Sequence, residues 1–343
     1  MLAACGGGGG SSSAEPDLLI EGAGIKGPLA YASVELYKYD TGFEELYDPN
    51  NPIASATTSA YAKFSGLRVP RGVAPPFILV IDGTNAIDLN TGVAPVIKKL
   101  VTVITERALN YDKSVYATPY TTLAYNMLAI SESENPGVPL ETALAEFNEM
   151  IVRSIGFGMP AEVDLFGTPP LITISTKTVD EQQIVVQYRA AIEALSTLLH
   201  EIYLPNPAVS TDDLLRFLAS DLYSDSVIDD SNGGQTTLGI LDTDILGQEP
   251  MSLKIANTDY YVRDTIALMD EERALVGVNI RTPFLTDSLS VSLQPASLDA
   301  TVASAPGSGG GSTGTVPDSM DLASTLLASG LVASGPIVIS GDS

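Results

Sequence analysis

The spacing of the apolar residues changes once along the chain, near Tyr116, and this change restricts the fold more than any other feature. Before it, apolar residues alternate with polar ones or form short continuous runs, as they do in β-strands. After it, they recur at the period of an amphipathic helix. The sequence therefore predicts an α+β protein, with a β-sandwich over residues 18–110 followed by an all-α helical domain over residues 117–280.

Three segments of the N-terminal region have the pattern of strands. Residues 31–39 alternate, so that Val34 and Leu36 would share a buried face. Residues 77–81 read Phe-Ile-Leu-Val-Ile, an unbroken apolar run that is typical of a central strand buried on both faces. Residues 96–105 are rich in β-branched side chains and are expected to form the last strand. Gly and Pro separate these segments, as in a β-sandwich.

The helical region carries start and stop signals for five helices. Thr118 can cap the first helix, which would have Pro119 at its first position. The second helix is expected to follow Pro139 and to end at Gly156. The remaining three are expected over residues 180–203, from a cap at Ser210 onward, and over residues 259–274.

The start of the strand-rich region is similar to a known module. Residues 24–30 read Gly-Ile-Lys-Gly-Pro-Leu-Ala and lead into Ala-Ser-Val-Glu-Leu at residues 32–36, and Lys-Phe-Ser-Gly-Leu at residues 63–67 precedes the run at residues 77–80. These motifs resemble transthyretin-like modules of the carboxypeptidase-regulatory type, over about a quarter of the chain. Residues 59–62 replace the Gly-containing turn usual in such modules. The resemblance implies an Ig- or transthyretin-like β-sandwich that serves as a non-catalytic spacer or binding unit.

Two further motifs resemble bacterial lipoproteins. Residues 117–124, Ala-Thr-Pro-Tyr-Thr-Thr-Leu-Ala, are similar to a group of Gram-negative surface lipoproteins whose helical part is uncharacterised. Leu2-Ala3-Ala4-Cys5 resembles a lipobox, the end of a lipoprotein signal peptide, where the Cys thiol receives a diacylglycerol. A Gly/Ser run follows Cys5, so residues 1–17 are expected to form a disordered tether. The resemblance implies an exported protein, anchored in the membrane through Cys5 at the outer membrane or cell surface.

Composition argues against several classes of function. The net charge is −25, from 42 acidic and 17 basic residues, whereas nucleic-acid binding requires a cationic surface. The chain has one His and one Cys, too few for a zinc site built from these residues. A Ser-His-Asp site would have to use His200, which is expected on the polar face of its helix beside Glu193, and the chain has no G-x-S-x-G motif. We therefore predict no catalytic site.

An acidic loop after the fourth helix is the candidate metal site. Its acidic residues include Asp221, and Gly residues follow, as in many loops that bind Ca²⁺ through oxygen ligands. The spacing departs from an EF-hand, because Ile240 stands where that motif has a bidentate Glu. A solvated turn is the alternative interpretation. The candidate Ca²⁺ ligands are Asp225, Asp229, Asp230 and Asn232.

Tyrosines are the candidate anchors for a ligand or partner surface, since the chain has no Trp. The candidates are Tyr37, Tyr39, Tyr61, Tyr260 and Tyr261; core packing is the alternative role for each.

The C-terminal part changes composition again. Residues 281–302 are expected to contain a short strand, at residues 289–293, or an extended segment. Residues 303–343 are a Gly/Ser linker and a low-complexity tail. Within it, residues 336–340 are expected to add a strand to the sheet edge of another chain, either a protein partner or a second copy; a frayed end is the alternative.

Taken together, these features favour a non-catalytic, lipid-anchored envelope protein that acts in binding or assembly. One alternative is an accessory lipoprotein of an outer-membrane uptake system, with an apolar ligand enclosed between the third and fourth helices. A second is a surface or filament subunit that self-associates through its C-terminal tail. A hydrolase is the remaining alternative.

Overall fold

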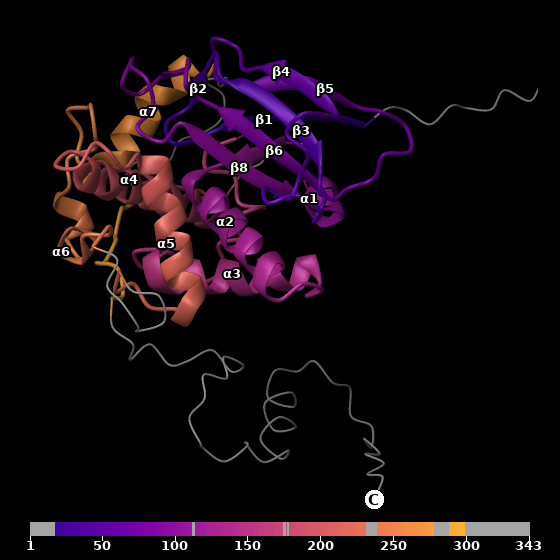
Figure 1. Cartoon of the computed structure of the whole chain (residues 1–343). Helices are drawn as coiled ribbons and strands as arrows, with labels where there is room; N and C mark the ends of the chain where they lie inside the picture. The colour runs from indigo at the N-terminus through magenta and orange to yellow at the C-terminus, as the bar shows by residue number, and fades with distance from the viewer. Residues whose placement is uncertain are drawn as a thin grey trace, which may run out of the picture. The chain divides into compact units, whose positions relative to one another are not determined.

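The computed structural model describes residues 18–111, 114–173, 176, 178–230, 239–277 and 288–298 (Figure 1). Strands come first along the chain and the longer helices follow, so the α+β prediction is confirmed. Both kinds of element contribute to one hydrophobic core, in which Leu79 of the strand-rich region belongs to the same cluster as Leu128 and Leu195 of the helical region.

The largest sheet has four antiparallel strands in the order β4-β3-β6-β8. Its central strand β6 (Phe77–Asp82) is buried from Phe77 to Ile81, as the apolar run predicts. In β3 (Ser33–Lys38), Val34 and Leu36 are fully buried and Ser33 is exposed, so the alternating pattern is also confirmed. The flanking strands are β4 (Ala54–Thr57) and β8 (Lys99–Ile104).

A three-stranded sheet has the order β5-β1-β9. Strand β1 (Leu18–Gly24) pairs antiparallel with β5 (Phe64–Val69) and parallel with β9 (Ser114–Ala117). Gly22 allows β9 to come this close, because a Cβ atom on it would lie 1.8 Å from the carbonyl oxygen of Val115. The sequence pattern misses β9 and the short helix α1 (Glu106–Tyr111) before it. A pair of two-residue strands, β2 (Leu29–Ala30) and β7 (Ile87–Asp88), completes the strand-rich region.

The longer helices begin and end close to the predicted residues. Helix α2 (Pro119–Glu134) starts with a capping box in which the Thr118 side chain accepts from the Thr121 backbone. A similar box at Ser210 starts α5, and α3 ends at Gly156 as predicted. The helices that follow α2 are α3 (Leu140–Ile155), α4 (Val179–Tyr203), α5 (Thr211–Asp225), α6 (Thr243–Leu246) and α7 (Thr265–Leu275), and the 3₁₀ turns are η1 (Pro250–Ser252) and η2 (Val262–Asp264).

Two sequence predictions are wrong in detail. The fifth helix begins at Thr265 rather than near residue 259, because a bridge between Lys254 and Tyr261 and the turn η2 occupy the preceding residues. Residues 289–293 form no strand. Their backbone meets side chains of α4 instead, since Gln183 bonds both the N–H and the carbonyl of Ser290.

Helix α2 packs along the outer edge of β8 (Figure 1). The Thr121 hydroxyl donates to the carbonyl of Val101 at 2.7 Å, and the Thr122 hydroxyl accepts from the backbone N–H of Val101 at 2.9 Å. Further along the same edge, the Asp212 carboxylate of α5 accepts from the backbone N–H of Lys99 at 2.9 Å. Polar side chains of two helices thus replace a neighbouring strand and leave this edge closed to further pairing.

Among the described helices, none combines the length and the apolar character that a membrane crossing requires.

Candidate functional site

A groove of about 1040 Å³ runs between the loop that follows β3, helix α2 and helix α5. We call it the acidic groove. Six acidic side chains and two basic ones line it, together with a set of apolar residues. The acidic members are Glu44, Glu45, Glu132, Glu134, Asp212 and Asp213; the basic ones are Lys99 and Arg216; the apolar ones include Phe43, Leu46, Val101, Tyr125, Ala129, Ile130, Leu215 and Phe217.

The loop wall of the groove is held in place by tyrosines. The Tyr125 hydroxyl of α2 donates to the carbonyl of Glu45, which ties the loop to the helix. Leu46 adopts a left-handed backbone conformation, φ 57°, and its side chain is buried in the core. The ring of Tyr47 packs against the ring of Tyr37, with the centroids 4.3 Å apart and the ring planes tilted by 30°. These contacts tie the loop wall to α2 and to the core.

The two basic residues of the groove already have partners. The Lys99 ammonium donates to the Tyr47 hydroxyl at 3.3 Å and lies over the Tyr47 ring. Arg216 forms an ion pair with Asp213. Burial raises the pKa of Asp212, although its bonds from the backbone N–H groups of Lys99 and Lys98 act in the opposite direction. Because Lys99 and Arg216 already have partners, they do not neutralise the remaining carboxylates of the groove. The lining therefore keeps a net negative charge toward a ligand.

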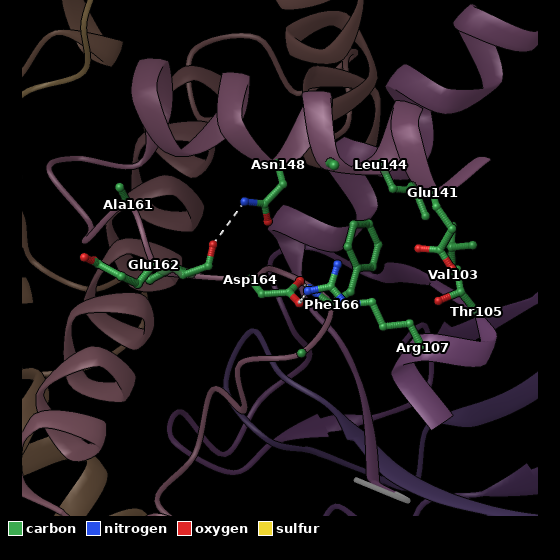
Figure 2. Close-up of a pocket in the computed structure, with 13 residues that line it drawn as sticks. Val103, Thr105, Arg107, Glu141, Leu144, Asn148, Ala161, Glu162, Asp164 and Phe166 are labelled. Atoms are coloured by element: carbon green, nitrogen blue, oxygen red, sulfur yellow. Dashed lines mark hydrogen bonds and ion pairs between the residues drawn. The ribbon is translucent and has the colours of Figure 1, made fainter. Parts of the chain in front are cut away.

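A smaller cavity of about 260 Å³ lies between the end of β8, helix α3 and residues 161–167. Figure 2 shows Asn148 pointing to this segment, where it donates to the carbonyl of Val163 at 3.0 Å, and Arg107 reaching Asp164 at 3.9 Å. Drug-sized ligands occupy cavities of roughly 300–1,000 Å³. The smaller cavity falls just below that range and the acidic groove just above it, so the acidic groove, which has room for a whole ligand of this size, is the stronger candidate. Residues of α4 line neither cavity, so neither lies between α4 and α5, the predicted third and fourth helices.

The interior contains a cluster of five charged side chains, which we call the buried charge cluster. Lys26 lies at the tip of the turn between β1 and β2, and its ammonium is 3.2 Å from Glu193 Oε2 and 3.5 Å from Asp88 Oδ2. Arg189 Nε donates to Glu193 Oε1 at 3.0 Å. The guanidinium also donates two bonds to Glu272 of α7, at 3.2 and 2.7 Å. All five side chains are at most 2% exposed.

The electrostatics of this cluster follow from burial and pairing. Burial by itself lowers the pKa of Lys26, but the carboxylates of Glu193 and Asp88 raise it above its ordinary value. Burial raises the pKa of Glu272, against the opposing effect of Arg189. With two cations and three carboxylates, the cluster carries a net charge of −1 when all five groups are ionised. It lies in a place that water does not reach.

Sequence reasoning misplaced the polar face of α4. We expected Glu193 to lie beside His200 on a polar face, but Glu193 is fully buried, and so are the neighbouring polar side chains of Ser196 and Thr197. The turn at Lys26 and residues near Ala256 cover them, the latter through a bond from the Ala256 N–H to Thr197. His200 is half-buried and stacks on Tyr203. The Arg189–Glu193 spacing of four residues was the available signal for a paired, inward-facing cluster.

The acidic loop uses its described carboxylates as acceptors for backbone N–H groups. Asp221 Oδ2 accepts from Asp229 at 3.1 Å and from Asp230 at 3.2 Å. Asp230 accepts in turn from Leu241 at 2.7 Å, and Asp225 accepts from the N–H two residues on. Asn232 lies outside the described residues. Within the described ranges, no group of three or more His, Cys, Asp or Glu side chains is placed to hold a metal ion, so the predicted Ca²⁺ ligands are not brought together there.

The five candidate tyrosines do not share one surface. Tyr37 is buried and donates to Glu35, whereas Tyr39 is half-buried and donates to Glu132 at the rim of the acidic groove, at 2.8 Å. Tyr61 is exposed in the turn before β5. The last two lie just before η2: Tyr260 donates to Glu271, and the Tyr261 ring lies 4.2 Å from the Arg263 guanidinium.

Comparison of the chain with protein-family models, with curated proteins and with solved structures finds no match. The predicted lipidation site Cys5 and the predicted pairing strand at residues 336–340 lie outside the described residues.

Proposed function

We propose that this chain is a non-catalytic binding protein of the bacterial envelope, tethered through Cys5, whose acidic groove receives a basic, partly apolar segment of a protein partner. The groove itself is the observation that carries this proposal. Its volume of about 1040 Å³ is sufficient for several side chains, and its lining combines apolar surface with an excess of carboxylates.

The physical argument has two parts. Apolar residues such as Ile130 and Phe217 supply surface whose burial favours association. Carboxylates such as Glu44 and Glu134 attract cationic side chains and speed their encounter with the groove. A ligand that satisfies both must carry basic and apolar groups together, as an amphipathic peptide segment does.

For the strand-rich region we propose an Ig- or transthyretin-like β-sandwich, built from the four-stranded and three-stranded sheets. The shared core supports this proposal, because Ile20 and Leu67 of one sheet and Leu36 and Leu79 of the other belong to the same apolar cluster. A sandwich of this kind would act as a rigid support for the loop wall of the groove.

A labelled peptide of alternating Lys and Leu residues tests the groove by fluorescence anisotropy. The double variant Glu132→Gln/Glu134→Gln should weaken binding several-fold at low salt, because two rim charges are lost while the side-chain shapes are kept. The matched control is Glu141→Gln/Glu162→Gln, which removes the same charge beside the smaller cavity. Equal weakening by both pairs would mean that the peptide binds the acidic surface as a whole and would overturn the groove proposal.

The anchor has a separate test. We expect the protein, expressed from its full gene in a Gram-negative host, to incorporate an alkyne-labelled fatty acid and to sediment with membranes. Cys5→Ala should be unlabelled and should remain in the soluble fraction. Equal labelling of the variant would remove Cys5 as the attachment point.

A further inference from the structure

Lys26, Asp88 and Glu193 bring an amine, a carboxyl group and a second carboxylate together out of reach of water. The ammonium of Lys26 lies 3.5 Å from Asp88 Oδ2 and 3.2 Å from Glu193 Oε2, and each of these side chains is 1% exposed. We propose that Lys26 Nζ and the Asp88 carboxyl carbon become joined by an amide bond inside the folded protein. Nothing in the acidic groove or the proposed function requires this bond.

The backbone is arranged so that the two groups meet. Gly27 follows Lys26 at the tip of the turn, and a Cβ atom there would lie 2.0 Å from Asp88 Oδ1. The absence of a side chain therefore lets the carboxyl group rest on the turn. Asp88 Oδ1 also accepts from the backbone N–H of Asn90 at 2.9 Å, which fixes the orientation of the carboxyl group. The separation of 3.5 Å between Nζ and Oδ2 places the amine directly beside the carboxyl group whose carbon it would attack.

Glu193 is placed to move the protons. Its two oxygens have different partners: Oε1 accepts from Arg189, which leaves Oε2 for Lys26. Arg189 is fixed in turn by its two bonds to Glu272. Arg189 and Glu272 are thus positioning residues, and Glu193 contacts the reacting nitrogen directly.

The reaction is a condensation that balances without a further reactant. Glu193 takes one proton from the Lys26 ammonium and passes it to the Asp88 carboxylate, which makes the amine a nucleophile and the neutral carboxyl group an electrophile. The nitrogen lone pair then attacks the carboxyl carbon. Glu193 takes a second proton from the nitrogen and gives it to the departing hydroxyl group, so that the C–O bond breaks and water leaves. An ammonium and a carboxylate become an amide and one water molecule. No electron is transferred, and the net charge of the cluster is unchanged.

Burial favours the product in two ways. The step removes a buried ammonium and a buried carboxylate, whose desolvation is costly, and replaces them with a neutral amide. The site also excludes the water that would hydrolyse that amide. The bond closes a covalent loop between positions 62 apart in sequence, so the turn after β1 and the strand β7 remain joined when the protein unfolds.

Intact-mass spectrometry of the full chain under denaturing conditions tests the proposal directly. We expect the mass to fall below the value calculated from the sequence and any lipid by that of one water molecule. Trypsin should fail to cleave after Lys26 and should yield one product that joins the peptide ending at Lys38 to residues 72–98. A wild-type protein with its full calculated mass and separate peptides would overturn the proposal.

Three variants assign the roles, each isolated as a folded monomer and checked by circular dichroism. Lys26→Arg keeps the positive charge but should retain the full mass. Glu193→Gln should also retain it, because the proton acceptor is lost. Glu271→Gln removes an exposed charge beside Glu272, outside the cluster and away from both reacting groups, and should still lose one water. Loss of water in Lys26→Arg would place the modification elsewhere, and loss in Glu193→Gln would exclude the proposed proton transfer.

Discussion

Arg189 of α4 and Glu272 of α7 form a fully buried bidentate ion pair, with N–O distances of 3.2 and 2.7 Å. The two residues are 83 positions apart in sequence, and their ion pair joins α4 to α7 at a place where neither charge can reach water. Such a pair contributes less to stability than its distances suggest, since both ions are desolvated on folding. Removing one partner of the pair is nevertheless costly, because the charge of the other partner stays buried.

Glu272→Ala should therefore lower the free energy of unfolding by about 3–5 kcal/mol. The cause is the Arg189 charge, which would then have Glu193 as its remaining carboxylate. Urea denaturation followed by circular dichroism measures the loss. The neighbouring Glu271→Ala removes the same charge from an exposed position and should change stability by only about 0.5 kcal/mol. A similar cost for both variants would contradict the role of the buried pair.

Gly27→Ala should be destabilising because the new methyl group would meet the Asp88 carboxyl group at 2.0 Å. Forcing atoms into a packed site costs about 1–3 kcal/mol. Thermal denaturation by calorimetry provides the measurement. Gly42→Ala is the control, since its nearest neighbour is the exposed Asp40 side chain at 3.1 Å, which can move away. Equal melting temperatures for the two variants would show that the close approach at Gly27 does not matter.

Thr122→Val should weaken the junction between α2 and β8. The substitution preserves shape but removes the acceptor for the buried N–H of Val101, and an unsatisfied buried donor costs about 1–3 kcal/mol. Hydrogen exchange of the Val101 amide, followed by NMR, should become faster together with the loss of stability. Thr84→Val changes an exposed residue in the same way and should leave both quantities nearly unchanged. Unaltered exchange at Val101 would argue against the edge bond.

His200 should titrate below its ordinary value of 6.5, because burial lowers its pKa, and the positive charge of Lys26 lowers it further in molecules in which Lys26 is not joined to Asp88. The folded protein therefore resists protonation of this imidazole. Its contribution to stability is present above the unfolded-state pKa and is lost as the pH falls towards the folded-state pKa. NMR can follow the imidazole without ambiguity, since the chain has one His. His200→Asn should reduce the loss of stability between about pH 7 and pH 5, and an imidazole pKa at or above 6.5 would contradict the prediction.

The elements that the sequence predicted best are those with strong local causes. The run from Phe77 to Ile81 leaves no face that could be exposed, and it forms the central strand. Thr118 and Ser210 each satisfy backbone N–H groups within one turn, and both cap helices. Such signals depend on near neighbours in the chain, so they do not require knowledge of the tertiary fold.

The predictions that failed or were missing depend on distant partners. Residues 289–293 have a strand-like pattern, but Gln183 offers its side-chain amide where a strand would offer its backbone. The polar face of α4 was expected to be exposed to water. The local sequence does not indicate that Lys26, which is 167 positions from Glu193, packs against this face. The acidic groove likewise combines residues from the loop after β3 with residues of α2 and α5.

The sequence by itself determined the α+β class, the order of strands and helices, and most helix ends, because hydrophobic period and capping are properties of short segments. Only the tertiary structure decided which polar residues are buried and which line a cavity. The physical reason is that an isolated helix or turn exposes its charged face to water whatever its sequence. The burial of Glu193, Arg189 and Lys26 becomes possible only when all their partners arrive together.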